Sequence, residues 1–598
     1  MKLSDYVVQF IENLGIKHLF LLPGGGCMHL LDSVGKSKEL DYVCNIHEQA
    51  CAIAADAYGQ YSNNMGVALV TTGPGGTNTI TGVAASWLDS IPVMIISGQV
   101  KRSDLSKGRG VRQMGFQEID IVSLVTPITK YACMVMEPET IKYHLEKAVF
   151  FSKNGRPGPV WVDIPLDVQA AMIDEERLSG FNGSEAETDT IILKDKVTET
   201  ISLLNNSKRP VILVGNGVRL SGGMNEFMEV AKLLQVPVLT TWKSIDFIPE
   251  DDPLFIGRPG SVGQRGANFS QQNSDFILII GARLDCGQTG YNHKNFARAA
   301  KIIMVDIDTN EVNKMETKID LEIVCDAKSY LKEILNQRDK ITNDDRTEWL
   351  RRCKKWQKDY PVVLPEYYEE KHVNNYVLID VLSELMTEND LMIPGSSGAS
   401  SEVTMQAFKV KKGQRIFNSE GLGPMGFGIA ASIGACLASG KRRTICIDGD
   451  GGFYMNVQEL ETVVRLTLPI KFFILNNQGY ASIRTTQSNY FEGKFVASDV
   501  SSGLTLPDAE KIAYAFGIPF YKIENHINID KKVKEVLDSK GPIICEIILS
   551  FDHVTAPKLS SYQKEDGSFV SRPLEDLAPF LSREELKRNM LIPVLEEE

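Results

Sequence analysis

The sequence predicts an α/β fold of three doubly wound domains with mostly parallel sheets, and three observations support this prediction. Short apolar runs rich in β-branched residues alternate with helical periodicities along nearly the whole chain, as in sheets covered by helices on both faces. A chain of 598 residues, 43% hydrophobic and 24% charged, has room for roughly three or four globular domains. Two polar, acidic stretches, 174–189 and 337–348, interrupt the alternation and are typical of linkers.

These linkers divide the chain into three segments and a tail. The predicted domains cover residues 1–173, 190–336 and 350–550, and each segment is close to the common size of a domain. Residues 551–598 follow a less regular pattern, so we expect them to form a C-terminal tail.

Composition excludes several classes of function. The net charge is −13 and no basic block occurs, so we expect no nucleic-acid partner. No apolar run approaches the roughly 18 residues that span a bilayer, and the N-terminal residues lack the order of a signal peptide. Ten cysteines without a CxxC pattern are typical of reduced thiols. We therefore expect a cytoplasmic protein that acts on small molecules and has no membrane partner.

The first segment brings an acidic residue close to a glycine loop. A strand over Tyr42–Ile46 leads into a helix that begins near Glu48, and a second strand, Val67–Thr71, leads into the loop Thr72–Asn78. A glutamate in the first turn of a helix commonly interacts with the helix dipole. The glycines of the loop would permit the close approach of a flat ring.

The middle segment has the pattern of a nucleotide-binding sheet. A strand over Pro210–Val214 ends in a GxG turn, and two later strands end near Asp285 and Asp306. A carboxylate at the end of a parallel strand is a natural acceptor for ribose hydroxyls. The segment therefore predicts a nucleotide site.

The third segment carries the most specific motif. A strand, Thr444–Asp448, ends in Gly-Asp-Gly, and 24 residues later a second strand, Ile470–Leu475, ends in Asn-Asn, with a helix expected over Asn456–Thr467. In a right-handed βαβ unit both strands point the same way, so Asp450 and Asn477 should emerge at one edge of the sheet. Carboxylate and amide oxygens there would suit Mg²⁺ or Ca²⁺.

With this spacing the chain resembles the thiamine-diphosphate (ThDP) enzymes, whose metal motif has the same form. The resemblance implies that Asp450, the Asn477 side chain and the Gly479 carbonyl hold Mg²⁺ against the diphosphate of ThDP. It makes the first domain pyrimidine-binding, the central domain nucleotide-binding and the third domain diphosphate-binding. The residues that would contact ThDP are Gly73, Asn78, Gly423, Met425, Gly449, Gly451, Gly452 and Tyr480.

The segment Ser419–Gly428 contains GLGxMGFG and resembles the acetolactate-synthase branch of these enzymes, in its large catalytic subunit. The resemblance implies that Met425 bends the cofactor under its own thiazolium ring. It also implies that Glu48 donates a hydrogen bond to the aminopyrimidine ring and drives its tautomerisation. Because the family assembles each site from two chains, a homodimer or homotetramer is implied.

Three features bear on the substrate pocket. Phe116 and Gln117 match the FQE segment that borders the pocket in acetolactate synthases. The GRPGPVxVDIP pattern is typically followed by lysine, but here Leu166 follows. An ungapped alignment puts Thr486 where the family carries a tryptophan. Both departures point to a bulkier, less anionic acceptor.

The middle segment resembles the FAD-binding members of the same group, through GARxD, VDID and a later CDAK. The implied FAD-binding residues are Arg156, Gly215, Gly217, Thr240, Gly281, Arg283, Asp285, Asp306 and Asp326. Gly287 stands where the family commonly has a second arginine, so adenosine diphosphate or an empty domain stays the alternative. A flavin would be structural, since the net reaction transfers no electrons.

Taken together, the motifs imply a ThDP- and Mg²⁺-dependent enzyme, a carboligase or transferase. It would decarboxylate a 2-keto acid, with pyruvate expected, and pass the two-carbon acyl carbanion to a carbonyl acceptor. The tail Arg572–Met590 resembles tails of relatives in unusual-sugar pathways, which suggests a nucleotide-linked keto-deoxysugar acceptor. The alternatives are an acetolactate synthase of branched-chain amino-acid biosynthesis, and a ThDP-dependent decarboxylase or a C–C hydrolase acting on a dione. A non-catalytic nucleotide-binding subunit is disfavoured by the intact Glu48, Asp450 and Asn477.

Overall fold

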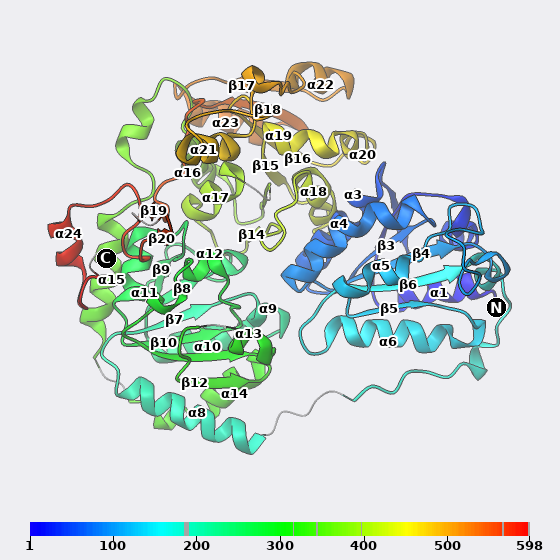
Figure 1. The fold of residues 1–598 in the computed structure, drawn as a ribbon, viewed down its shortest axis with the longest axis horizontal. Coiled ribbons are helices and arrows are strands. Elements are labelled where there is room, and N and C mark those ends of the chain that lie inside the picture. Colours follow the sequence, from blue (N-terminus) through cyan, green and yellow to red (C-terminus); the bar gives the residue numbers. More distant parts are fainter. Residues whose placement is uncertain (185–189, 315, 343–344, 396–397, 565–566, 596–598) are drawn as a thin grey trace. The chain divides into compact units, whose positions relative to one another are not determined.

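The computed structural model describes residues 1–184, 190–314, 316–342, 345–395, 398–564 and 567–595. It contains three six-stranded sheets, and every strand pair within them is parallel (Figure 1). The predicted fold class is therefore confirmed. Parts of both predicted linkers, 185–189 and 343–344, lie outside the described residues.

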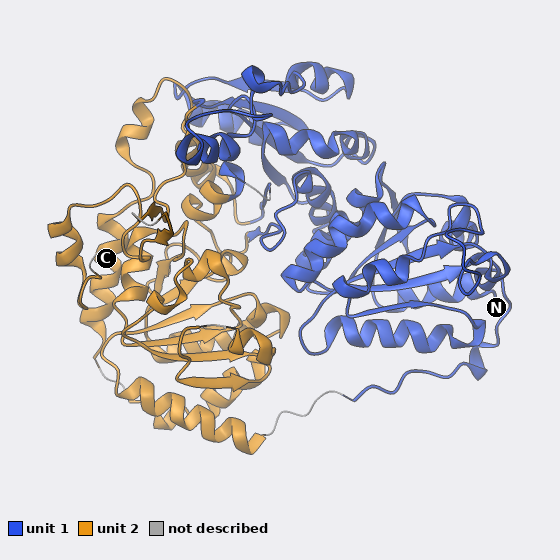
Figure 2. Cartoon of the chain, viewed as in Figure 1, with its two compact units in different colours: residues 1–185, 389–401, 415–551 blue, residues 186–388, 402–414, 552–598 orange. Residues whose placement is uncertain are grey.

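The chain forms two compact units (Figure 2). The first unit consists of residues 1–185, 389–401 and 415–551, and it holds the first and third sheets. The second unit consists of residues 186–388, 402–414 and 552–598, and it holds the second sheet together with the tail.

The first sheet has the strand order β2-β1-β3-β4-β6-β5. Its strands are β1 (His18–Leu21), β2 (Asp41–Cys44), β3 (Gly66–Val70), β4 (Val93–Gln99), β5 (Tyr131–Met134) and β6 (Val160–Pro165). All residues of β3, β4 and β6 are buried, which explains why these strands read as continuous apolar runs. The helices that alternate with them are α1 (Leu3–Asn13), α2 (Met28–Lys36), α3 (Glu48–Ser62), α4 (Pro74–Asp89), α5 (Ile121–Val125), α6 (Ile141–Lys153) and α7 (Leu166–Gln169).

The second sheet has the order β12-β11-β10-β7-β8-β9. Its strands are β7 (Pro210–Val214), β8 (Val238–Thr240), β9 (Phe255–Gly257), β10 (Phe276–Ile280), β11 (Lys301–Asp306) and β12 (Leu321–Val324). The central strands β7 and β10 are buried along their whole length. The accompanying helices are α8 (Thr190–Asn205), α9 (Gly217–Leu220), α10 (Met224–Leu234), α11 (Arg265–Gln272), α12 (Cys286–Thr289), α13 (Thr309–Asn313), α14 (Ala327–Asn336), α15 (Thr347–Asp359) and α16 (Asn375–Leu385).

The third sheet has the order β14-β13-β15-β16-β18-β17. Its strands are β13 (Leu391–Pro394), β14 (Arg415–Ile416), β15 (Thr444–Gly449), β16 (Ile470–Asn476), β17 (Phe520–Ile523) and β18 (Ile543–Ile548). The helices of this part of the chain are α17 (Ala399–Ala407), α18 (Phe427–Ala438), α19 (Asp450–Phe453), α20 (Leu460–Arg465), α21 (Ala481–Tyr490), α22 (Ala509–Ala515) and α23 (Ile529–Asp538).

The helix predicted over Asn456–Thr467 is confirmed in part. The α-helix α20 covers Leu460–Arg465, and a 3₁₀ segment, η10 (Tyr454–Glu459), separates it from α19. Asn456 breaks the helix with φ −132° and ψ 32°, and its side-chain amide donates to the carbonyl of Gly426 at 2.8 Å. This tertiary hydrogen bond outweighs the helical periodicity of the local sequence.

The first and third sheets share a core in the first unit, where α3 packs on α18. A Cβ atom added at Gly434 would lie 2.0 Å from the carbonyl oxygen of Ala54, so the two helix backbones touch. This contact explains the many small residues of both helices, because larger side chains would hold the backbones apart.

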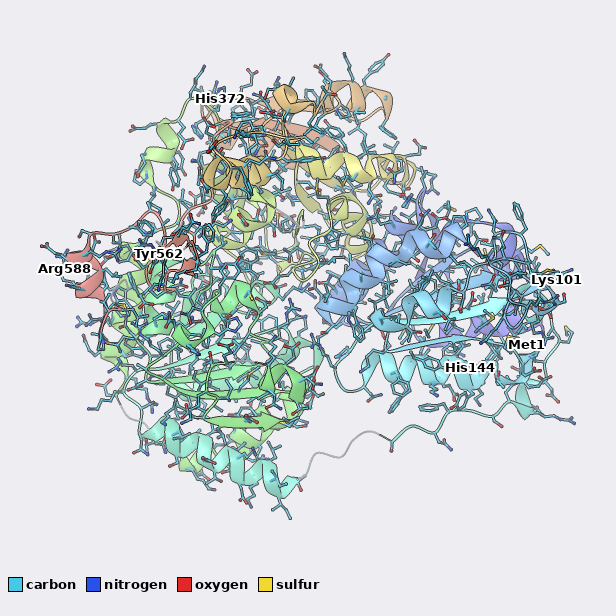
Figure 3. All side chains as sticks on the ribbon, in the orientation of Figure 1. Met1, Lys101, His144, His372, Tyr562 and Arg588 are labelled. Carbon is cyan, nitrogen blue, oxygen red and sulfur yellow. The ribbon has the colours of Figure 1, made fainter. Side chains whose placement is uncertain are left out.

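The tail packs within the second unit as β19 (Ser561–Gln563), β20 (Phe569–Ser571) and α24 (Arg583–Asn589). The helix α24 buries Leu586, while Arg588 on its other side is exposed at the edge of the ribbon (Figure 3). Arg265 donates to the carbonyls of Leu577 and Pro579, which fixes the tail to α11. Among the described residues, every helix is too short or too polar to cross a membrane.

Candidate functional site

The candidate metal ligands lie at the ends of two paired strands. Strands β15 and β16 pair in parallel with Gly449 opposite Leu475, which confirms the predicted neighbourhood of the two motifs. Asp450 follows β15 and accepts hydrogen bonds from the backbone N–H of Gly479 (3.0 Å) and of Gly451 (2.9 Å). The fold thus brings the loop that contains Asn477 and Gly479 against Asp450.

The carboxylate of Asp450 is buried, with 5% of the residue exposed. Burial raises the pKa of Asp450 to about 6, although hydrogen bonds from backbone N–H groups oppose the shift. Such a carboxylate is stabilised when a cation binds beside it. Among the described residues no three His, Cys, Asp or Glu side chains gather as a metal site, so the predicted site depends on one carboxylate and neutral oxygens.

Arg484 binds the carbonyls of the same loop, although no motif of the sequence indicates it. Its guanidinium is 4% exposed and donates to the carbonyls of Asn477 (2.8 Å), Gln478 and Ser498 (both 3.3 Å). It also lies 3.9 Å from the ring centroid of Phe551. Its one sequence signal is its position seven residues after Asn477. That signal is weak, because surface arginines on helices are common.

Met425 lies beside the glycines that follow Asp450. A Cβ atom added at Gly451 would lie 2.2 Å from the ring of Tyr480 and 3.3 Å from Cε of Met425. Three of the predicted ThDP contacts therefore meet at one point. Gly423 has a φ of 62°, a conformation that favours glycine in the turn before Met425.

The glycines Gly449 and Gly452 flank another buried carboxylate, Asp448. A Cβ atom at Gly452 would lie 2.5 Å from Oδ1 of Asp448, which accepts the N–H of Gly449 at 2.9 Å. Burial raises the pKa of Asp448 to about 7. Ser396 and Ser397, between β13 and α17 in the sequence, lie outside the described residues.

Glu48 is the first residue of α3 and is 7% exposed. Its carboxylate accepts a hydrogen bond from Nδ2 of Asn78 at 2.9 Å. Gly73 directly precedes α4, the helix that contains Asn78, and has a φ of 64°. A Cβ atom at Gly73 would lie 2.3 Å from the carbonyl oxygen of Gln117. The predicted residues Glu48 and Asn78 thus form one contact, and Gly73 and Gln117 form another.

The remaining candidates for the substrate pocket are Phe116, Thr486 and Leu166. Phe116 is 86% exposed, in the loop that precedes α5. Thr486 is exposed on α21, where its hydroxyl donates to the carbonyl of Ser482 at 3.1 Å. Leu166 is half-buried at the start of α7, directly after β6.

The predicted nucleotide residues of the second unit gather at the carboxyl ends of its strands. Gly215 and Gly217 follow β7, Gly281 follows β10, and the N–H of Gly217 donates to the carbonyl of Gly281 at 3.0 Å. A Cβ atom at Gly215 would lie 2.3 Å from the same carbonyl oxygen. Thr240 ends β8, and its buried hydroxyl has no hydrogen-bond partner among the described residues.

The acidic candidates here have structural partners. Asp285 accepts from the backbone of Gln288 as the N-cap of α12 and pairs with Arg283 at 3.1 Å. Asp326 caps α14 by accepting from Ser329 at 3.0 Å, and Asp306 ends β11.

Arg156 belongs to the other unit, at the amino end of β6. Its Nε donates to the hydroxyl of Ser90 at 2.9 Å.

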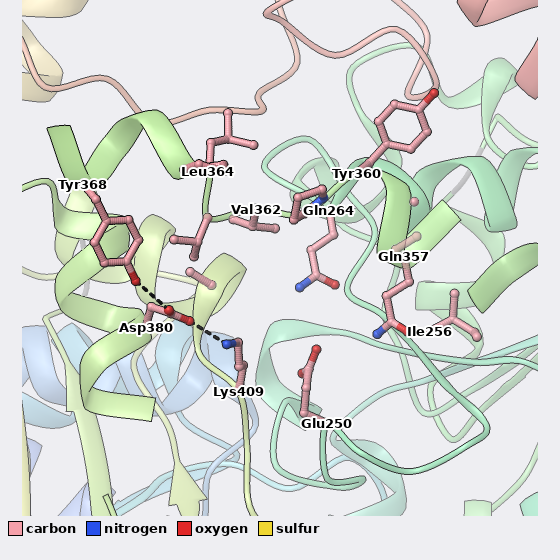
Figure 4. Close-up of a pocket in the computed structure, with 16 residues that line it drawn as sticks. Glu250, Ile256, Gln264, Gln357, Tyr360, Val362, Leu364, Tyr368, Asp380 and Lys409 are labelled. Atoms are coloured by element: carbon pink, nitrogen blue, oxygen red, sulfur yellow. Dashed lines mark hydrogen bonds and ion pairs between the residues drawn. The ribbon is translucent and has the colours of Figure 1, made fainter. Parts of the chain in front are cut away.

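A separate cavity of about 540 Å³ lies within the second unit (Figure 4). Its walls are formed by the apolar run after α15, including Val362 and Leu364, and by polar groups on the opposite side. Asp380 there accepts from the hydroxyl of Tyr368 and pairs with Lys409 at 2.6 Å. None of the predicted site residues lines this cavity.

Comparison with known families gives three matches. Residues 1–124 match the thiamine pyrophosphate enzyme N-terminal TPP binding domain, residues 197–334 the central domain, and residues 396–547 the C-terminal TPP binding domain. Thiamine pyrophosphate is another name for thiamine diphosphate.

Curated relatives are similar over nearly the whole chain. An acetolactate synthase large subunit of Cyanidium caldarium is 32% identical over 565 residues, which cover 93% of this chain and 94% of the relative. A probable acetolactate synthase large subunit of Methanocaldococcus jannaschii is 33% identical and covers 92% of each chain. The acetolactate synthase large subunit of Lactococcus lactis is 31% identical, covering 93% of this chain and 94% of its own.

Proposed function

This chain belongs to the thiamine pyrophosphate enzyme family as an acetolactate-synthase-like member, and on that premise we propose that it decarboxylates a 2-keto acid and transfers the two-carbon acyl unit to a carbonyl acceptor. The reaction would require ThDP and Mg²⁺. The acyl donor would be pyruvate, as the relatives named acetolactate synthase suggest.

The observation that carries the proposal is the contact between Asp450 and the loop of Asn477 and Gly479. One carboxylate, one amide and one carbonyl are hard oxygen ligands that suit Mg²⁺, and they leave positions for phosphate oxygens. Burial raises the pKa of the Asp450 carboxyl, and a bound cation would stabilise its charged form, which supports a metal ion at this position. Asp450, Asn477 and Gly479 would hold the ion, and Arg484 would fix the carbonyls of their loop.

When bound, ThDP supplies a nucleophilic thiazolium carbon and an acceptor for the electrons released as CO₂ leaves. Glu48 would hold a proton at its carboxyl against the pyrimidine ring, and Asn78 orients that carboxyl. Met425 would support the ring from below, close to Tyr480 and Gly451. Gly73 and Gly423 would allow the backbone to approach the cofactor.

The first candidate acceptor is a second pyruvate. Two pyruvate anions and one proton then give one acetolactate anion and CO₂, which balances atoms and charge. The names of the relatives support this acceptor.

A second candidate is a bulkier, neutral carbonyl compound such as a nucleotide-linked keto-deoxysugar. The observations that favour it are Thr486, small and exposed on α21, and Leu166, half-buried where a lysine would carry charge. Phe116 and Gln117 would border the same pocket.

Product analysis tests both candidates. The protein is incubated with ThDP, Mg²⁺ and pyruvate, with and without nucleotide-linked 4-keto-sugars, and products are identified by mass spectrometry. Acetolactate from pyruvate alone, unchanged by the sugar, supports the first candidate and contradicts the second. A branched sugar carrying two added carbons gives the reverse result. Absence of any ThDP-dependent loss of pyruvate contradicts the proposal itself.

We further propose that the second unit binds FAD as a structural group, through the strand-end loops around Gly215, Gly281 and Arg283. The closely packed glycines and the unpartnered hydroxyl of Thr240 support a cradle for a nucleotide. Asp285, Asp306 and Asp326 complete the proposed set within the second unit. Visible absorbance of the purified protein tests flavin, and its absence together with released adenosine diphosphate would favour the alternative.

We also propose a homodimer or homotetramer in the cytoplasm. Family resemblance supports the oligomer, and ten free cysteines support a reducing compartment. Light scattering during size-exclusion chromatography measures the mass of the oligomer.

A further inference from the structure

A buried carboxylate of the diphosphate-binding part contacts the turn that presents Glu48. Glu459 ends η10 and is 0% exposed. Its Oε1 accepts the backbone N–H of Ile46 at 2.8 Å and that of His47 at 3.1 Å. These two residues directly precede Glu48.

The other oxygen of Glu459 is also engaged. Its Oε2 accepts from Nδ2 of Asn45 at 2.8 Å and from the hydroxyl of Thr462 at 2.9 Å. One carboxylate therefore accepts four hydrogen bonds, three of them from the consecutive residues 45–47. Four hydrogen bonds to one buried side chain fix the turn firmly, because a donor that loses its acceptor in a buried environment is costly.

The turn has a specific task in the fold. It joins β2 to α3, and Glu48 is the first residue of α3. His47 is the N-cap of the helix, with Nδ1 accepting the N–H of Gln49 at 3.1 Å. A shift of the backbone at residues 46 and 47 would move the Glu48 carboxylate by a similar distance, because no flexible segment separates them.

We propose that Glu459 is a positioning residue for Glu48: it holds the Asn45–His47 turn so that the Glu48 carboxylate keeps its orientation toward Asn78. This inference rests on the function proposed above. Glu459 acts as a hydrogen-bond acceptor, and its role requires the reach and shape of its side chain.

A second carboxylate makes the reverse contact, from the first predicted domain to a turn of the third. Asp89, the last residue of α4, accepts the backbone N–H groups of Glu420 (3.0 Å) and Gly421 (2.8 Å). That turn leads to Met425. Each half of the first unit thus uses a carboxylate to hold the turn before a proposed cofactor contact of the other half.

The test compares three substitutions at Glu459. E459A removes all four acceptors, and E459D withdraws the carboxylate by one methylene but keeps the charge. E459Q keeps one carbonyl oxygen for Ile46 and His47. Its amide can donate to Oδ1 of Asn45, which has no hydrogen-bond partner among the described residues, if the Asn45 amide rotates.

The first readout uses the protein without cofactor. Hydrogen–deuterium exchange of the peptide containing residues 46 and 47 should be at least about 10-fold faster in E459A and E459D, and within about 3-fold of wild type in E459Q. The control is E461A, which alters an exposed glutamate two residues away and should change nothing.

The second readout separates position from binding. With ThDP and Mg²⁺, kcat and the rate of deuterium exchange at the thiazolium C2 should fall about 10- to 100-fold in E459A and E459D, with ThDP affinity altered less than about 5-fold. E459Q should restore both rates to within about 5-fold of wild type.

Several outcomes would overturn the inference. Equal loss in E459Q and E459A, with activity kept in E459D, would mean that the charge or a proton of Glu459 matters, and not its reach. If E459A fails to fold, the comparison of E459D with E459Q still tests the inference, because E459D should exchange faster and turn over more slowly than E459Q. A wild-type protein that binds no ThDP would defeat the proposed function alone, because the exchange of residues 46 and 47 in the cofactor-free protein remains measurable.

Discussion

Aspartates follow parallel strands in both units of this protein, but they serve different purposes. In the first unit Asp450 contacts Gly479 on the neighbouring strand's loop, and its carboxylate is buried. In the second unit Asp285 and Asp326 accept from the backbone three residues later and cap α12 and α14. Both uses follow from the same position, since a strand end in an α/β fold is also a helix start.

The difference shows how to separate a ligand site from local structure. A capping aspartate satisfies its own helix and is a complete local unit. Asp450 instead joins two strands and lies in a buried environment that raises its pKa to about 6. Carboxylates that join distant parts of the chain are therefore the stronger candidates for chemistry, and the following changes test that rule.

The largest effect is expected at Glu48. E48Q should lower kcat by about 10²- to 10⁴-fold, because the amide cannot hold and release the proton that the proposed reaction needs. Steady-state decarboxylation of pyruvate measures it. The control is E39Q at an exposed glutamate of the same unit. Unchanged turnover in E48Q would remove Glu48 from the mechanism.

D450N should raise the Mg²⁺ concentration required for half-maximal activity about 100-fold, since one ligand charge is lost while the side-chain volume is kept. Titration of the metal in the presence of saturating ThDP measures this shift. The matched substitution D326N should leave the metal requirement unchanged, because asparagine caps helices as well as aspartate. Similar shifts in both variants would break the distinction between the two units.

Asp163 should make the first unit more stable as the pH falls from 7 to 6. The side chain is buried in β6, accepts from Ser97 and Gln99, and burial raises its pKa to about 7. A carboxyl group with a raised folded pKa stabilises the fold fully below its unfolded pKa, near 4, and loses that contribution as the pH rises through 7. The gain between pH 7 and 6 is about 1 kcal/mol.

Chemical unfolding at both pH values measures the gain, which should be about 1 kcal/mol smaller in D163N, because Asp448, whose pKa burial also raises to about 7, still contributes. Hydrogen exchange can assign the change to the first unit. An equal gain in D163N would show that other groups cause the pH dependence.

The smallest effect is expected from D326A. Loss of the cap on α14 should cost about 1 kcal/mol, seen as a fall of about 2–4 °C in the thermal midpoint of the second unit. Nucleotide or flavin content should stay the same if Asp326 is only a cap. A parallel loss of flavin would instead support the FAD role that the sequence suggests.

The fold class and the order of the motifs follow from the amino-acid sequence alone. Buried parallel strands appear as continuous apolar runs, so β3, β7, β15 and β16 could be located to within a residue or two. The pairing of β15 with β16 followed from the spacing of Gly-Asp-Gly and Asn-Asn, because a short right-handed crossover leaves few other arrangements.

Which side chains support those motifs depends on how the chain is folded in three dimensions. Arg484, Glu459 and Asp89 belong to no motif, because most of their partners are backbone groups, which every residue has. Asn456, at the start of the predicted helix, has non-helical φ and ψ for the same reason, because its side chain donates to the carbonyl of Gly426. Periodicity and motifs report on side chains near in sequence, whereas a hydrogen bond to a distant backbone depends on how the chain is folded.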